Sequence, residues 1–238
     1  MVRTRLGHVY LCQPLPLQPQ PEPTDHPLHD IVALDPGVCT FMHAYDPQCL
    51  SAEWGGQDIQ RVFRLCHAVD KLQSAWSQQG VTHKRRCRLQ RAARRIRLKI
   101  RNIVDDLHKK LAKWLVDSYR QVLLPTFDTS KMVVRGARKI RSKTARQMLT
   151  WSHYRFKMRL ISKAREHPWC QVKIVNEAYT SKTCGDCGAM NHDVAMMANH
   201  RIYNCRTCHF EADRDFNGAR NILLRHLTES VGPPPPVV

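Results

Sequence analysis

Long hydrophobic runs are missing from this sequence. No stretch approaches the ~20 apolar residues of a membrane-spanning helix, so we expect no membrane association. The first residues, MVRTRLGHVYLCQPLPLQ, also lack the continuous apolar segment of a secretory signal peptide. These absences predict an intracellular protein. In a reducing compartment its ten cysteines are expected to stay as thiols or to bind metal.

Acidic residues are scarce. The 238 residues include 20 Asp and Glu against 38 Lys and Arg, which gives a formal net charge of +18. Such a basic chain is typical of proteins that bind polyanions, most often nucleic acids, although a merely solvated basic surface is the alternative. Hydrophobic residues make up 42% of the chain, enough for one large domain, alone or with a small appendage.

Four cysteines have the spacing of a metal site. Cys184 and Cys187 form one CxxC pair, Cys205 and Cys208 form a second, and seventeen residues separate the pairs. This spacing predicts a zinc ribbon in which four thiolates hold a structural zinc ion. Three histidines are alternative ligands: His192, His200 and His209. The other six cysteines have no ligand-like spacing and are expected to be free thiols.

The first half of the chain predicts strands followed by helices. A short strand is expected at 7–12, with its pairing partners missing or on another chain, and a six-proline stretch follows it as an extended linker. A buried strand, 29–34, leads into Asp35-Pro36-Gly37, and two more strands are expected at 38–47 and 50–54. An aspartate that ends the first strand of such a meander is typical of an RNase H-like fold, in which it holds a metal; a simple turn is the alternative.

Apolar residues at helical spacing then predict two helices, 57–79 and 84–122, that form an antiparallel hairpin inserted in the sheet. The segment 84–101 carries ten basic residues and no acidic one. We expect it to contact nucleic-acid phosphates, with a nuclear localisation patch or a solvated face as alternatives. The arginines concerned are Arg85, Arg86, Arg88, Arg91, Arg94 and Arg95.

The second half predicts a strand at 121–127 that ends near Asp128, then a basic loop, 133–143. A helix over 143–167 is expected, capped by Ser142. Its predicted inward residues are Ala145, Leu149, Phe156 and Leu160.

A strand at 170–177 brings Glu177 to its end, and Asp215 precedes a last helix, 216–227. Asp213 is expected to support this region rather than to bind metal. Asn217 and Arg220 are candidates to contact phosphate, with capping and solvation as alternatives.

The DPG turn at Asp35, the VNEAYTSKTCGDCG segment and the DRDFNGARNI segment together form a recognisable pattern. The chain resembles the RuvC-like nuclease half of the transposon-encoded TnpB proteins, which are related to type V CRISPR effectors. Within that group it looks most like the eukaryotic relatives called Fanzor, on the phrases LLPTFDTSKM and VNEAYTSKTCGDCG. The resemblance covers about residues 30–227.

The resemblance implies RNA-guided, magnesium-dependent DNA cleavage, with DNA and a guide RNA as partners and a nuclear location in a eukaryotic source. It indicates no particular oligomeric state. Asp35 matches the first catalytic aspartate and Asp215 the third acid. The second acid matches Glu177, which Fanzor-like members place just ahead of the ribbon; Asp128 is the alternative. Carboxylates suit this chemistry because Mg²⁺ prefers oxygen ligands, and two such ions can flank the phosphorus.

We therefore expect an α/β, RNase H-like (RuvC) mixed sheet. The expected units are a remnant strand and linker, 1–28; a nuclease core, 29–182, with the helical insertion 57–122; a ribbon, 183–210; a last acidic segment and helix, 211–228; and a disordered tail, 229–238. Family members carry an N-terminal barrel and a recognition lobe, so the chain is expected to be truncated. The competing function is a non-catalytic nucleic-acid-binding protein; a purely structural role leaves the charge and the acids unexplained.

Overall fold

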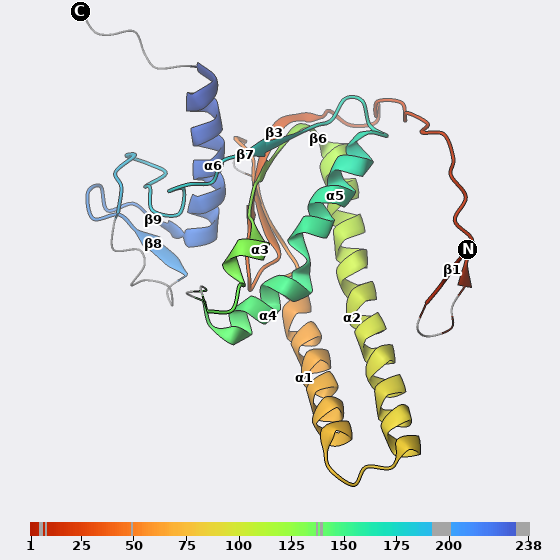
Figure 1. The fold of residues 1–238 in the computed structure, drawn as a ribbon. Coiled ribbons are helices and arrows are strands. Elements are labelled where there is room, and N and C mark those ends of the chain that lie inside the picture. Colours follow the sequence, from red (N-terminus) through yellow and green to blue (C-terminus); the bar gives the residue numbers. More distant parts are fainter. Residues whose placement is uncertain are drawn as a thin grey trace, which may run out of the picture.

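The computed structural model describes residues 1–4, 7, 9–48, 50–136, 138, 140–191 and 201–231 (Figure 1). A five-stranded mixed sheet with strand order β5-β4-β3-β6-β7 forms its centre. The strands are β3 (His29–Pro36), β4 (Met42–Tyr45), β5 (Ser51–Trp54), β6 (Tyr119–Pro125) and β7 (Gln171–Val175). The first three form the predicted antiparallel meander, and β6 and β7 run parallel to β3.

Helices cover both faces of the sheet because the central strands are apolar on both sides. Val32 and Leu34 of β3 pack with α1 (Asp58–Ser77), α2 (His83–Ser118) and α5 (His153–Ala164). Ala33, between them, points to the other face and packs against α6 (Arg214–Val231). Since side chains alternate along a strand, Asp35 lies on the same face as Ala33, toward α6.

The α1–α2 hairpin connects β5 to β6 and projects from the sheet, as predicted (Figure 1). Its second helix is shorter than expected. It ends at Ser118 rather than Val122, because Tyr119 already pairs with His29 in the parallel ladder between β6 and β3.

The helix predicted over 143–167 is two helices, α4 (Ser142–Trp151) and α5, separated by Ser152 in a left-handed conformation with φ 55°. The break brings Trp151 and Phe156 against the same ring, that of Phe41, with centroid distances of 5.4 and 5.3 Å. Two local predictions for this region are wrong. Leu149 is 59% exposed, and Ser142 is the first residue of α4 rather than its cap.

The N-terminal strand has a partner within this chain. β2 (Val9–Tyr10) pairs with β1 (Val2–Arg3), so the expectation that its partners are missing is wrong. The proline-rich stretch has no regular structure and is tied to the core by an ion pair of Glu22 with Arg120 at 2.8 Å.

At the other end α6 runs to Val231, beyond the end of the predicted helical segment, and 232–238 of the predicted tail lie outside the described residues. No helix in the described part of the chain combines the length and apolar character needed to cross a membrane.

Two histidines are buried with Phe41 beneath the sheet. The rings of His108 and His153 stack on Phe41 at 4.8 and 4.9 Å, and His108 Nε2 donates to the carbonyl oxygen of Trp151 at 2.9 Å. Burial lowers the pKa of His108 to about 4, aided by the charge of Arg159. Burial and the neighbouring His108 lower the pKa of His153 to about 3.

These depressed pKa values predict acid sensitivity. The unfolded chain binds a proton at each histidine with a pKa of ~6.5, whereas the folded chain does not until near pH 4 or 3. The free energy of unfolding should therefore fall by about 1.4 kcal/mol per pH unit for each histidine below ~pH 6. His153→Phe should remove one such contribution between pH 6 and 4, measured by urea unfolding with tryptophan fluorescence. Tyr154→Phe, at an exposed neighbour, is the control; parallel curves for His153→Phe and the parent would contradict the prediction.

Candidate metal centres and nucleic-acid interface

Three acidic residues predicted as a site approach one another at the carboxyl ends of the parallel strands. Asp35 stands near the end of β3, and Glu177 follows the end of β7 by two residues. Asp215 lies in the first turn of α6, not before the helix as predicted. This edge is where open α/β sheets place their ligand sites, because the loops that follow parallel strands gather there.

The three carboxyl groups influence one another electrostatically. Burial is the main cause that raises the pKa of Asp35 to about 8; the negative charges of Asp215 and Glu177 contribute to the rise, and Arg214 opposes it. Burial also raises the pKa of Glu177, although the backbone N–H of Phe127 donates to it and opposes the rise. Like charges held together in a buried place require a neutralising partner, either a proton or a cation.

Asp128, the alternative second acid, faces away from this group. Its carboxylate accepts from Ser130 Oγ and pairs with Lys131 Nζ at 3.1 Å, and these neighbours lower its pKa. The side chain is 44% exposed, and its charge is not among those that shift the pKa of Asp35.

Helix α6 packs on Asp35 through a glycine. A Cβ atom at Gly218 would stand 2.6 Å from Asp35 Oδ2, closer than real side chains approach, so a larger residue here would displace the carboxylate. Asp213, just before the helix, caps it: Oδ1 accepts from the backbone N–H groups of Asp215 and Phe216 at 2.9 and 3.2 Å. The cap fixes the first turn, and with it the position of Asp215.

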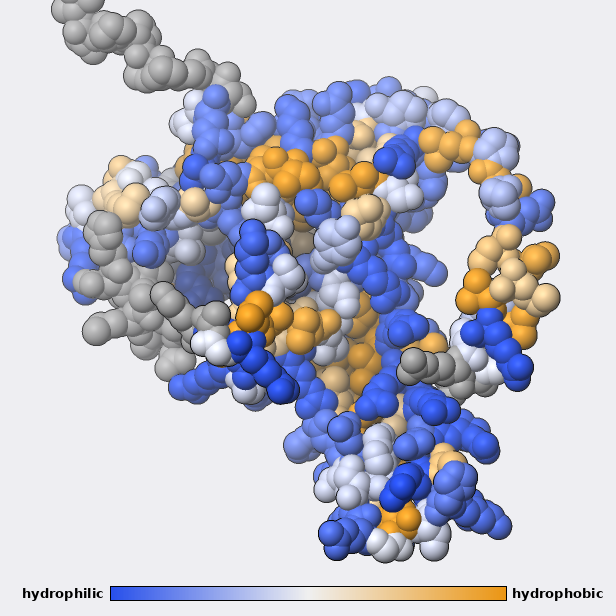
Figure 2. Space-filling model, in the orientation of Figure 1, coloured by the Kyte–Doolittle hydropathy of each residue, from blue (hydrophilic) through white to orange (hydrophobic). Residues whose placement is uncertain are grey.

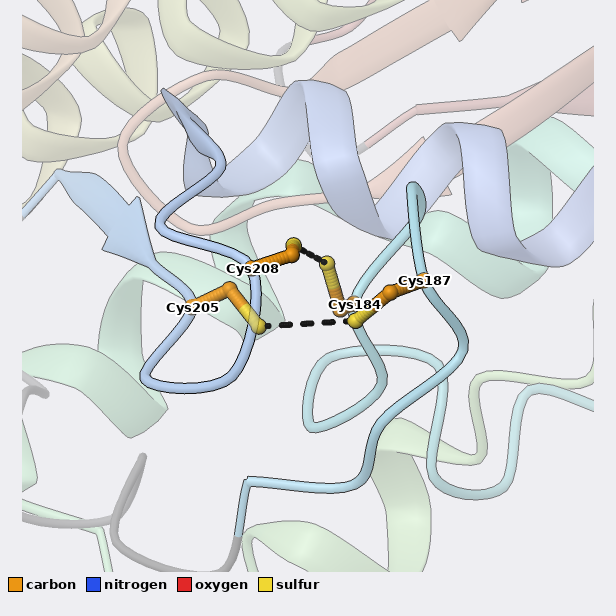
Figure 3. Close-up of side chains that lie close together, drawn as sticks. All are labelled: Cys184, Cys187, Cys205 and Cys208. Atoms are coloured by element: carbon orange, nitrogen blue, oxygen red, sulfur yellow. Dashed lines mark hydrogen bonds between the residues drawn. The ribbon is translucent and has the colours of Figure 1, made fainter.

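The four predicted cysteines form a compact cluster (Figure 3). The sulfur atoms of Cys184 and Cys208 lie 3.7 Å apart, as do those of Cys187 and Cys205. A tetrahedral zinc ion with Zn–S bonds of ~2.3 Å requires sulfur–sulfur distances of about 3.8 Å, so the donor set fits zinc. The backbone N–H of Cys208 is the main cause that lowers the pKa of Cys205, whereas the pKa of Cys184 and of Cys208 is raised, so the four thiols share protons as one group.

The two halves of the cluster share one backbone design. In each, the residue after the second cysteine is left-handed, Gly188 with φ 75° and His209 with φ 59°. The strands β8 (Ile202–Asn204) and β9 (Glu211–Asp213) flank the second pair. The side chain of His209 is exposed and lies outside the sulfur cluster, while His192 and His200 are outside the described residues.

Two buried asparagines of α6 hold the first cysteine loop. Asn217, fully buried, accepts from the Gly185 N–H and donates to the Thr183 carbonyl oxygen, both at 2.9 Å. Asn221, one turn later, donates to the same carbonyl and to that of Thr180. The prediction that Asn217 contacts phosphate is therefore wrong, because its amide is fully used inside the protein.

Sequence reasoning missed His43. It pairs with Asp35 across β3 and β4, is only 2% exposed, and places Nδ1 3.7 Å from Asp215 Oδ2. A polar residue in phase with Asp35 on an otherwise apolar strand is the signal that points to it.

Asp35 and Asp215 open into a cleft of about 1530 Å³, whose lining does not include Glu177. The charged lining is balanced, with five acidic side chains, those of Asp35, Glu53, Asp58, Asp106 and Asp215, and five basic ones, those of Arg61, Lys110, Lys182, Arg201 and Arg214. A wide cleft that holds both carboxylates and basic side chains suits a polyanion that must reach a bound cation.

The six predicted arginines of α2 are all exposed on the projecting part of the hairpin, which Figure 2 shows as mostly hydrophilic. At 3.6 residues per turn, Arg88, Arg91, Arg94 and Arg95 lie away from the seam that Ala93 makes with α1. None of the six makes an ion pair within the described residues.

Comparison with known proteins agrees with this architecture. Residues 153–222 match the family model "Cas12f1-like, TNB domain". A625R of Paramecium bursaria Chlorella virus 1, named as a transposase candidate, is 33% identical over 85% of this chain and 44% of its own length. The TnpB-like protein L79 of Acanthamoeba polyphaga mimivirus is 30% identical over 60% of this chain and 27% of its own.

A CRISPR-associated endodeoxyribonuclease, Cas12f1 of Sulfoacidibacillus thermotolerans, is 29% identical over 57% of this chain and 30% of its own. The chain is a RuvC-like protein of the TnpB/Cas12f family. It shares its fold with the cryo-EM structure of a Cas12f1–sgRNA–target DNA complex: the TM-score is 0.56 at 17% identity, over 81% of this chain and 49% of that one. This TnpB/Cas12f-family chain spans less than half the length of these relatives.

The asparagine contacts give a prediction for the free energy of unfolding. Asn217→Ala leaves the buried N–H of Gly185 without an acceptor, which should cost about 1–3 kcal/mol in urea unfolding. Asn191→Ala removes a comparable but exposed bond, from Nδ2 to the Asn204 carbonyl at 3.2 Å, and should cost less than about 1 kcal/mol. Equal losses in the two variants would contradict the role assigned to Asn217.

Proposed function

We propose that this chain is the metal-dependent nuclease module of an RNA-guided DNA endonuclease. The observation that carries the proposal is the placement of Asp35 and Asp215, from two separate segments, on the wall of one cleft, with Glu177 near enough for its charge to act on Asp35. Its relatives include a CRISPR-associated endodeoxyribonuclease. DNA and guide RNA are the proposed partners, and the division into a core, 29–182, a ribbon, 183–210, and a last acidic segment, 211–228, is part of the same proposal.

Each carboxylate has a distinct setting in this proposal. Asp35 is held deepest, with Gly218 against it, and Asp215 stands on a capped helix turn toward the cleft. Glu177 comes from the other side, steadied by the Phe127 N–H. Magnesium, when bound, would supply charge neutralisation on the phosphate and an activated water. The exposed basic side chains of the lining, Arg61 and Arg201, would hold the polyanionic backbone beside the carboxylates.

We propose Glu177 rather than Asp128 as the second acid. The charge of Glu177 acts on Asp35, whereas Asp128 is exposed and paired with Lys131. This position, just ahead of the ribbon, is the one expected of Fanzor-like members.

The four-cysteine cluster is proposed to bind structural zinc. It lies between Glu177 and Asp215 in the sequence and is fastened to α6 by Asn217 and Asn221. Zinc there would fix both approaches to the carboxylate group, which is a structural rather than a catalytic role.

A non-catalytic nucleic-acid-binding protein is the second candidate. The exposed arginines of α2 favour it, because they do not depend on the carboxylates. The two candidates differ in one respect: only the nuclease needs Asp35, Glu177 and Asp215 in their charged, metal-binding form.

The carboxylate variants test the nuclease. Asp35→Asn, Glu177→Gln and Asp215→Asn should each lower Mg²⁺-dependent cleavage of labelled DNA by about 10³-fold, because lost charge stabilisation costs several kcal/mol. The chain would be assayed with the RNA that co-purifies with it, and Mg²⁺ binding would be followed separately by calorimetry. Asp128→Asn is the control and should cleave normally. If Asp128→Asn loses cleavage while Glu177→Gln retains it, the assignment of Glu177 as the second acid is overturned. Equal activity in all four would overturn the nuclease.

Zinc content tests the ribbon. Purified protein should contain about one zinc per chain, and Cys184→Ser or Cys205→Ser should lose it, because three thiolates do not complete the tetrahedral shell. The exposed thiol variant Cys12→Ser, remote from the cluster, should keep the metal. Unchanged zinc in the two ribbon variants would refute the site.

Salt dependence tests the basic helix. Changing Arg88, Arg91, Arg94 and Arg95 to Gln should weaken binding to all duplex sequences alike. The slope of log affinity against log salt should flatten by about 0.9 for each duplex phosphate that the helix no longer neutralises. The control changes four other exposed basic residues to Gln: Arg3, Lys109, Arg120 and Arg165. An unchanged slope in the α2 variant would place the binding elsewhere, for instance on the basic loop 133–143.

A further inference from the structure

His43 stands inside the carboxylate group without a hydrogen-bonding partner of its own among the described residues. It lies on β4 directly opposite Asp35 and is 2% exposed. Its Nδ1 faces Asp215 Oδ2 at 3.7 Å, and its Nε2 faces Glu53 Oε1 at 3.4 Å. Neither contact has hydrogen-bond geometry, so both ring nitrogens are unsatisfied within the part of the chain that the structure describes. A buried nitrogen left in that state costs about 1–3 kcal/mol, which calls for a partner.

The surroundings indicate which partner would satisfy the ring. Neutral imidazole has one N–H and one lone pair. If Nε2 donates to Glu53, the lone pair of Nδ1 faces the carboxylate of Asp215, two acceptors directed at each other. Such a pair is stabilised by a metal ion between the two atoms or by a proton on Nδ1. Ligand atoms of His43, Asp213 and Asp215 all lie within 4.8 Å of one another.

The distances suit a shared ion. Two ligand atoms that each lie ~2.1 Å from one metal are between about 3.0 and 4.2 Å apart, depending on the angle at the metal. The 3.7 Å between His43 Nδ1 and Asp215 Oδ2 falls in this range. Glu53 occupies the position of the outer carboxylate that commonly orients a metal-binding histidine through its other ring nitrogen.

We propose that His43 is a metal ligand of the carboxylate site, joining Asp215, and that it makes the site prefer Mn²⁺ to Mg²⁺. This inference rests on the proposed function, since it concerns the same metal. Mg²⁺ is hard and takes oxygen ligands, whereas divalent transition ions also accept imidazole nitrogen. Glu53 acts as a positioning residue: with the metal bound, Nε2 would donate to it, which would fix the tautomer of His43.

Mn²⁺ binding to the full chain tests this assignment without reliance on cleavage. The paramagnetic resonance signal of free Mn²⁺ gives the Kd for Mn²⁺, and competition with Mg²⁺ gives the Kd for Mg²⁺. His43→Ala should weaken Mn²⁺ binding by about tenfold or more and change the Mg²⁺ constant less than about twofold. Spin-echo modulation from a nitrogen bound to Mn²⁺ should appear in the parent and vanish in His43→Ala. Glu53→Gln should have a smaller effect on the Mn²⁺ constant.

Controls separate the inference from the proposed function. His209→Ala, an exposed histidine beside the ribbon, should retain both the affinity and the nitrogen signal. Metal-free His43→Phe, which removes the unsatisfied nitrogens and keeps the volume of the buried ring, should melt no lower than the parent.

If Asp215→Asn loses Mn²⁺ but His43→Ala does not, the histidine is not a ligand and only this inference fails. A lower melting temperature of metal-free His43→Phe with unchanged Mn²⁺ affinity would also overturn it, in favour of an imidazolium paired with Asp215. If Mn²⁺ binding survives Asp35→Asn and Asp215→Asn as well, the proposed function fails too.

Discussion

The close approach of Gly218 to Asp35 is the constraint on which the rest of this arrangement depends. A side chain at Gly218 would push the Asp35 carboxylate out of place, because a Cβ atom there would stand 2.6 Å from it. With glycine, α6 lies directly on β3, and its buried residues Ala219, Ile222 and Leu223 complete the second core. The same helix then presents Asp215 to the cleft. The contact between α6 and β3 therefore determines both the packing of the second core and the position of Asp215.

This packing explains the roles of individual residues in the DRDFNGARNI segment. Asp213 caps the helix, Asp215 joins the carboxylates, and Asn217 and Asn221 grip the first cysteine loop one turn apart. Because residues four apart share one face of a helix, both asparagines reach the same stretch of backbone, Thr180 to Gly185. A short segment therefore connects the sheet, the carboxylates and the cysteine cluster.

The sequence predicted those features that depend on local pattern. The cysteine spacing, the strand that ends at Asp35 and the apolar period of the hairpin helices are each encoded in adjacent residues. The break at Ser152 was not predictable in this way, because it serves the packing of Trp151 and Phe156 on Phe41, far earlier in the chain. His43 was missed for a similar reason: its importance comes from its cross-strand pairing with Asp35 and from a helix near the other end of the chain.

The cysteine cluster and the carboxylates are mechanically connected. Glu177 precedes the first cysteine pair and Asp215 follows the second, so the segment between them determines how far apart these two acids can move. If that segment were unconstrained, it would lose conformational entropy whenever Glu177 and Asp215 came close together. The repulsion between their negative charges would also oppose this approach. A zinc ion bound as proposed would join the two ends of the segment at four sulfurs, and the contacts of Asn217 and Asn221 attach the first end to α6, so most of that freedom would be lost in advance. The cysteine cluster would then stabilise the position of the carboxylates without contacting them.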